Sequence, residues 1–132
     1  MGVCASVTLQ EHLSSAGSAR RFTARMCRSA GVSIGASEVA VLLTSELVAN
    51  AIVHGHSEPR LTVTINRQGV QVEVGDLSDT TCANTKAGRE AETGRGLAMV
   101  ETCATRWGVR PNRRGKTVWF EVADTGPREP LI

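Results

Sequence analysis

The sequence predicts a single α+β domain. Its 132 residues fit one compact domain, and an apolar fraction of 41% is enough to build a core. Strand and helix patterns follow one another along the chain without internal repeats. Two segments with period-two apolar residues, 61–65 and 70–74, flank the turn residues Asn66 to Gly69 and predict a β-hairpin.

The first part of the chain predicts a strand and two helices. Alternating apolar residues predict the strand over about residues 3 to 10. Ser14 or Ser15 is suited to cap a helix that runs to Gly31, a residue type that commonly ends helices. A second helix is expected over about residues 37 to 55.

The part after the hairpin begins with residues 77–93, which are small and polar and lack a period. We expect a long mobile loop there, and long loops inside compact domains are usually functional. Gly94 and Gly96 then open a short helix over about residues 97 to 100.

The chain closes with two expected strands, near residues 105–110 and 116–122. We expect the domain to span residues 1–123 and residues 124–132 to form a flexible tail.

Composition argues against several function classes. A net charge of +2, two Phe, two Trp and no Tyr give little support for nucleic-acid binding. The arginine pairs Arg20–Arg21 and Arg113–Arg114 are read either as solvated surface or as a local basic face for an acidic partner. The four cysteines show no zinc or redox spacing, so we expect reduced, mostly buried thiols. With no leader pattern and no apolar run of membrane length, we expect a cytoplasmic protein without membrane contact.

Three polar residues stand every fourth position in an otherwise apolar helical segment: Glu46, Asn50 and His54. Side chains four apart stack on one helix face, so a carboxylate, an amide and an imidazole line one edge. This set suits Mg-nucleotide chemistry, because Mg²⁺ prefers oxygen ligands and keeps waters and phosphates as its others. The alternative is an ordinary amphipathic helix that shows its polar edge to water.

Asp76 follows a strand whose valines, at positions 70, 72 and 74, alternate with polar residues. If the strand reaches Asp76, that residue shares the valine face and needs a hydrogen-bond donor such as the amino group of adenine. The alternative is that the strand ends at Gly75 and Asp76 begins a turn.

Thr93-Gly94-Arg95-Gly96 precedes a helix start. Glycines let backbone N–H groups approach an anion, and a helix N-terminus adds partial positive charge, so this segment predicts a phosphate seat. The alternative is a plain turn and cap.

In this order the three pieces resemble the N, G1 and G2 boxes of the GHKL ATPase superfamily. More narrowly, Ser-Ala-Arg20-x-Phe22, Glu-Leu-Val-x-Asn-Ala-x-x-His and the closing Gly-Lys-Thr-Val-Trp-Phe-Glu-Val look like the bacterial anti-sigma factor serine/threonine kinases, especially their single-domain actinobacterial type. The resemblance covers about residues 5 to 123. It implies the Bergerat fold: a two-layer α/β sandwich in which about three helices and a flexible ATP lid cover a mixed, mostly antiparallel sheet.

The resemblance also implies roles for single residues. Glu46 matches the general base, Asn50 the magnesium ligand and Asp76 the residue that reads adenine. Arg95 adds charge to the phosphate turn of the lid, and His54 stands where the family often has His. The expected ATP-contacting residues are Asn50, His54, Asp76, Ser78, Gly94, Arg95, Gly96 and Leu97.

The sequence departs from the family pattern in the G1 box. The usual Asp-x-Gly-x-Gly is here Asp76-Leu-Ser78-Asp-Thr80, without either glycine, so the backbone beside the base has less conformational freedom. In the last strand Lys116 is expected on the same face as Val118, and Thr117 on the other face. The sequence assigns contact with adenine to neither Lys116 nor Thr117.

The resemblance therefore implies an ATP- and Mg²⁺-dependent serine/threonine kinase that acts as an anti-sigma factor. Such a protein binds a sigma factor, phosphorylates an anti-anti-sigma protein with a STAS domain, and forms a homodimer. The alternative, motivated by the altered G1 box, is a non-catalytic module that binds ATP, senses nucleotide and binds a protein partner.

Overall fold

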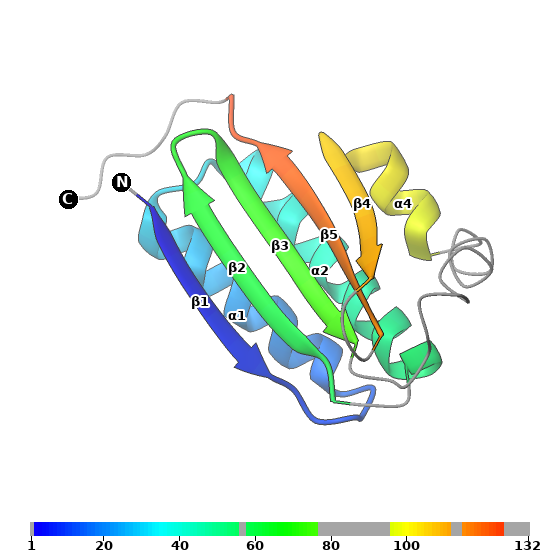
Figure 1. Cartoon of the computed structure of the whole chain (residues 1–132). Coiled ribbons are helices and arrows are strands. Elements are labelled where there is room, and N and C mark those ends of the chain that lie inside the picture. Colours follow the sequence, from blue (N-terminus) through cyan, green and yellow to red (C-terminus); the bar gives the residue numbers. More distant parts are fainter. Residues whose placement is uncertain (1, 56–57, 77–95, 112–114, 126–132) are drawn as a thin grey trace.

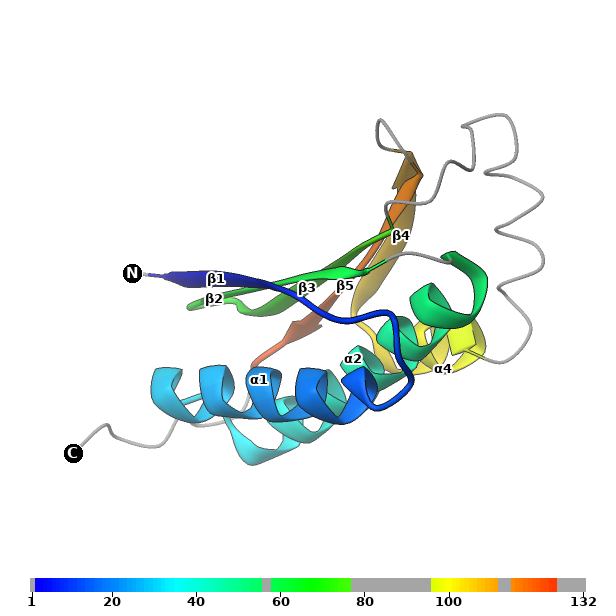
Figure 2. The same cartoon turned by 90° about the horizontal axis from the view of Figure 1, so that it is seen from below.

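A five-stranded sheet with helices on one of its faces makes up the computed structural model, which describes residues 2–55, 58–76, 96–111 and 115–125 (Figures 1 and 2). The elements in chain order are β1 (Val3–Thr8), α1 (Ser15–Ala30), α2 (Ile34–Gly55), β2 (Arg60–Asn66), β3 (Gly69–Asp76), α4 (Gly96–Cys103), β4 (Arg106–Pro111) and β5 (Lys116–Ala123). The α+β sandwich expected from the sequence is confirmed.

The strand order is β1-β2-β3-β5-β4. The expected sheet was mixed and mostly antiparallel, and every described pairing is antiparallel. The predicted hairpin joins β2 to β3, and the side-chain oxygen of Asn66 accepts the backbone N–H groups of Gln68 and Gly69 at 2.8 and 3.3 Å. Because β5 lies between β3 and β4, the last of the described strands lies inside the sheet.

The helix α1 begins and ends where the sequence predicts. Ser14 occupies the N-cap position, although its hydroxyl hydrogen-bonds to His12 Nδ1 (2.8 Å) instead of capping the helix. Gly31 ends the helix in the left-handed conformation, with φ of 72°. A buried hydrogen bond of 3.2 Å from Thr23 Oγ1 to Thr44 Oγ1 then ties α1 to α2.

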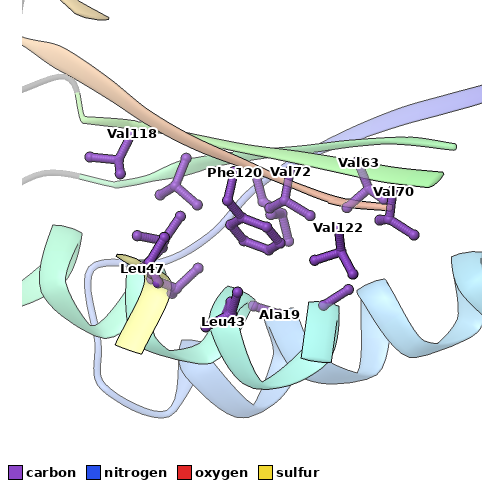
Figure 3. Packing of buried hydrophobic residues seen from close by; sticks show 14 of the residues in the cluster. Ala19, Leu43, Leu47, Val63, Val70, Val72, Val118, Phe120 and Val122 are labelled. Atoms are coloured by element: carbon purple, nitrogen blue, oxygen red, sulfur yellow. The ribbon is translucent and has the colours of Figure 1, made fainter. Parts of the chain in front are cut away.

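The core lies between α2 and the middle of the sheet (Figure 3). Leu43 and Leu47 of α2 face Val72 of β3 and Phe120 of β5, and all four side chains are at most 2% exposed. Full burial of one such side chain contributes about 1.5–3 kcal/mol. This apolar contact decides which face of α2 turns inward and which edges stay accessible.

The helix α2 begins at Ile34, three residues before the predicted start. Ser33 precedes this start, and its Oγ accepts the backbone N–H of Ala36 at 3.4 Å, as the side chain of an N-cap residue does. The Asp124 carboxylate, 91 residues further along the chain, accepts the backbone N–H of Ser33 at 3.1 Å. A negative charge at a helix N-terminus is favourable. Asp124 was expected to begin the tail, but it is bound to the domain; residues 126–132 lie outside the described part, so the tail remains a prediction.

The cysteines differ from the expectation of mostly buried thiols. Cys27 is buried, whereas Cys4 and Cys103 are exposed, because they lie on the edge strand β1 and at the end of α4. Burial, the main cause, raises the pKa of the Cys27 thiol, and the Asp124 carboxylate acts in the same direction while a hydrogen bond with Ser37 opposes it. Cys82 lies outside the described residues.

Within the described ranges α2 is the one helix long and apolar enough to cross a bilayer, a result that the sequence analysis did not anticipate. Length and composition are weak evidence, because the core helix of a soluble protein passes the same test. The inward face of α2 packs on the sheet, whereas the large apolar side chains of Ile34, Leu42 and Val53 are exposed.

The helices α1, α2 and α4 lie on one side of the sheet (Figure 2). The opposite face carries polar and charged side chains. Arg106 pairs with Glu121 at 2.6 Å, and Arg110 pairs with Glu73. The Trp119 indole lies over Gly108, where an added Cβ would come within 2.9 Å of it. We refer to this side of the sheet as the uncovered face.

Gly69 offers a test of the hairpin geometry. Its φ is 149°, and an added Cβ would lie 2.1 Å from the Val122 carbonyl oxygen. We expect Gly69→Ala to lower the free energy of unfolding by at least about 2 kcal/mol. The measurement is denaturant unfolding followed by circular dichroism.

The matched control is Gly35→Ala, because nothing lies within 4 Å of a Cβ added there and the site is helical. That change should leave stability equal or raise it by about 0.5 kcal/mol. Equal stabilities of the two variants would contradict the described β2–β3 turn.

Candidate functional site

The last turns of α2 and the tip of the β3 arrow lie at the same end of the sheet (Figure 1). The helix α4 lies beside β4 and contacts α2. Contacts of α2 with β3, β5 and α4 place these elements against one another. The predicted site residues are distributed over these three elements.

Glu46 and Asn50 lie on the edge of α2 that borders its buried stripe. Both are half-buried, whereas Leu43 and Leu47 beside them are fully inside. The four-residue spacing therefore does what the sequence predicts: it sets the two polar side chains one turn apart on one edge.

The amide of Asn50 is the most informative polar group of this edge. Its Nδ2 atom is buried and has no hydrogen-bond partner among the residues that the structure describes. A buried donor left without a partner costs about 1–3 kcal/mol, and such groups are rare in folded proteins. This cost is explained if the amide serves a bound molecule rather than the fold.

His54 lies one turn beyond Asn50, in the last turn of α2, and is exposed. The predicted line of three polar groups therefore passes from a half-buried edge to open solvent at the helix end.

Asp76 is the last residue of β3, so the prediction that the strand reaches it is confirmed and the alternative of a turn after Gly75 is wrong. In the β3–β5 ladder Asp76 pairs with Lys116, and Val74 pairs with Val118. Val72 and Val74 of this strand are buried beneath the helices. The side chain of Asp76 lies outside the described part of the structure, so its place on the same face stays a prediction.

Of the remaining predicted site residues, those at the start of α4 are described by the structure and the others are not. Gly96 is the first residue of α4, as the sequence suggests. Leu97 is fully buried in the core, so its side chain serves packing, and its backbone is what remains for contact with a phosphate. Ser78, Gly94 and Arg95, together with the predicted loop over 77–93, lie outside the described residues.

One polar contact beside Glu46 was not foreseen from the sequence. The Arg20 guanidinium of α1 donates from Nη1 to Ser45 Oγ at 2.9 Å, next to Glu46 in the chain. The sequence identified Arg20 as part of an arginine pair and of the resemblance. It carries no signal for this contact, which joins two helices across 25 positions.

The donor set at this site fits a magnesium nucleotide better than a protein-held metal. In the described ranges no three His, Cys, Asp or Glu side chains gather as metal ligands. A hard cation that keeps phosphate and water ligands needs few oxygens from the protein, and the Asn50 amide is suited to supply one.

A cavity of about 390 Å³ lies elsewhere, around the β2–β3 hairpin and the end of β5. Its lining includes Gln68, Gln71 and the Arg106–Glu121 ion pair, so its two charges already neutralise each other. We place the candidate site at α2 instead, because that edge combines a carboxylate with a buried amide that has no described partner.

Comparison with known proteins bears on the family and the fold of the chain. The family model described as the histidine kinase-like ATPase domain matches residues 9–122. Among solved structures, the RsbU and RsbW domains of Rv1364c from Mycobacterium tuberculosis superpose with a TM-score of 0.69 at 19% sequence identity, a likeness of fold. The match covers 98% of this chain and 35% of that one, so this chain spans about a third of its length. No curated protein matches.

The buried Asn50 amide leads to a stability prediction. We expect Asn50→Leu to keep or raise the free energy of unfolding, by up to about 1 kcal/mol, because the substitution removes a buried donor without a described partner. Denaturant unfolding measures this change.

Asn66→Leu is the matched control, since the Asn66 oxygen accepts two backbone N–H groups in the hairpin turn. This variant should lose about 1 kcal/mol. A large loss of stability in Asn50→Leu would show that the amide has a structural partner.

Proposed function

Since the chain belongs to the histidine kinase-like ATPase domain family of the GHKL superfamily, we propose that it is a serine/threonine protein kinase that uses Mg-ATP. The observation that carries this proposal is the α2 edge, where the half-buried carboxylate of Glu46 stands one turn from Asn50, whose buried Nδ2 atom has no hydrogen-bond partner among the described residues. Family membership supports ATP binding, and the residues along this edge support transfer of the terminal phosphate.

In this proposal Glu46 acts on the protein substrate. The oxygen of a serine or threonine hydroxyl attacks the γ-phosphorus. The bond between that phosphorus and the oxygen that bridges the β- and γ-phosphates breaks, and ADP leaves. Glu46 orients the hydroxyl and accepts its proton, an effect worth about 10²–10⁴-fold in rate. The Arg20–Ser45 hydrogen bond supports the helix turn from which Glu46 projects.

The nucleotide contacts follow the chain order. Asn50 would hold Mg²⁺, which supplies charge compensation on the phosphates, and His54 extends the same edge toward them. Asp76 accepts a hydrogen bond from the base. Gly94, Arg95, Gly96 and the backbone of Leu97 offer N–H groups and positive charge to the phosphates, and Ser78 completes the set.

The proposed partners are proteins. We propose that the chain binds a sigma factor and phosphorylates an anti-anti-sigma protein with a STAS domain, as a cytoplasmic homodimer without nucleic-acid or membrane contact. The motif resemblance to anti-sigma factor kinases supports this, as does the likeness in fold to a structure that contains an RsbW domain.

A second candidate is a non-catalytic module that binds ATP and changes its affinity for a protein partner. The specific observation in its favour is the G1 segment after Asp76, which lacks both glycines of the family pattern. This module would have the same nucleotide site as the proposed kinase, but it would not transfer the phosphoryl group.

Phosphoryl transfer provides the test. Incubation with radiolabelled ATP, Mg²⁺ and purified STAS-domain proteins should label one of them, and Glu46→Gln should reduce the initial rate about 10²–10⁴-fold because the proton acceptor is gone. The dissociation constant for Mg-ATP, measured by calorimetry, should change less than about threefold because the charge at Asp76 and the Asn50 amide remain.

Glu38→Gln is the matched control, because Glu38 is an exposed carboxylate two turns earlier on the same helix. It should transfer phosphate at the wild-type rate. Equal rates for the two variants would refute the role of Glu46, and nucleotide binding without transfer to any STAS protein would favour the binding module.

A further inference from the structure

The last pair of the β3–β5 ladder joins residues of opposite charge, Asp76 and Lys116. The pair before it on the same face is Val74 with Val118, of which Val118 is visible near Leu47 in Figure 3. Strand alternation places Lys116 on the face of Val118, beyond the core, and its ladder position is directly opposite Asp76.

Register sets how close these two positions are. Residues directly opposite on antiparallel strands lie on the same face, with Cβ atoms about 4.5–5.5 Å apart. Lys116 is half-buried, and its flexible stem carries an ammonium group that donates up to three hydrogen bonds and accepts none. A ligand that reaches Asp76 is therefore also within reach of Lys116.

The two groups read a purine base in complementary ways. An ionised carboxylate is an acceptor only, so it favours the 6-amino donor of adenine and disfavours the 6-oxo acceptor of hypoxanthine or guanine. An ammonium group beside it supplies the missing donor. The pair can then satisfy either kind of base, so the difference in affinity between 6-aminopurine and 6-oxopurine nucleotides becomes small.

We propose that Lys116 determines base selectivity and that the nucleotide site accepts 6-oxopurine triphosphates as well as ATP. This inference rests on the proposed function, because it concerns the same nucleotide site. It differs from a purely structural role, in which the Asp76–Lys116 pair closes the strand ends and affects stability without affecting the base.

The experiment compares Mg-ATP with Mg-ITP, because adenine and hypoxanthine differ at position 6 and in the protonation of the adjacent ring nitrogen. Calorimetric dissociation constants for the wild-type chain should agree within about threefold. In Lys116→Met the dissociation constant for Mg-ITP divided by that for Mg-ATP should rise at least about tenfold, since a charge-assisted hydrogen bond to the 6-oxo group is lost. Lys116→Arg, which keeps a cationic donor, should stay close to the wild-type ratio.

Arg67→Met is the control for loss of one positive charge, since Arg67 is exposed in the hairpin turn at the opposite end of β3. It should keep the wild-type ratio. A wild-type preference for ATP of a hundredfold, or an unchanged ratio in Lys116→Met, would overturn the inference. Failure to bind either nucleotide is a different result, because it would refute the nucleotide site itself.

Discussion

The packing of α2 against the middle of the sheet is the contact on which the rest of the molecule depends. Leu43 and Leu47 pack against Val72 and Phe120, and this contact fixes the rotation of α2 about its own axis. Because residues four apart share a helix face, the same rotation sets the edge that carries the candidate site. Fold and site therefore use one helix, and a change that rotates α2 would affect both.

This sharing explains why a buried amide is tolerated. Asn50 stands next to apolar core positions, where a leucine would pack well, yet it keeps an amide nitrogen without a described partner. Local departures from the best choice for stability are typical of functional positions. The polar side chains of Ser15, Thr23 and Thr44 are buried in the core, and each is hydrogen-bonded within the fold.

Much of this arrangement follows from periodicity. The helical period placed Glu46, Asn50 and His54 along α2 as the structure has them, and the strand pattern predicted that β3 reaches Asp76. Periodicity does not predict long-range contacts, such as the hydrogen bond from the Ser33 N–H to the Asp124 carboxylate or the one from Arg20 to Ser45 on another helix. The parity of Lys116 was readable, but its partner depends on strand register, which local sequence does not specify.

The two tryptophans give the domain an optical property that follows from the sheet. With no tyrosine in the chain, ultraviolet emission arises from Trp107 and Trp119, on the adjacent strands β4 and β5. Trp119 rests on Gly108 at the uncovered face, away from the helices. The intensity and wavelength of the Trp119 fluorescence can therefore report the docking of a macromolecule on that side of the sheet, without an attached dye.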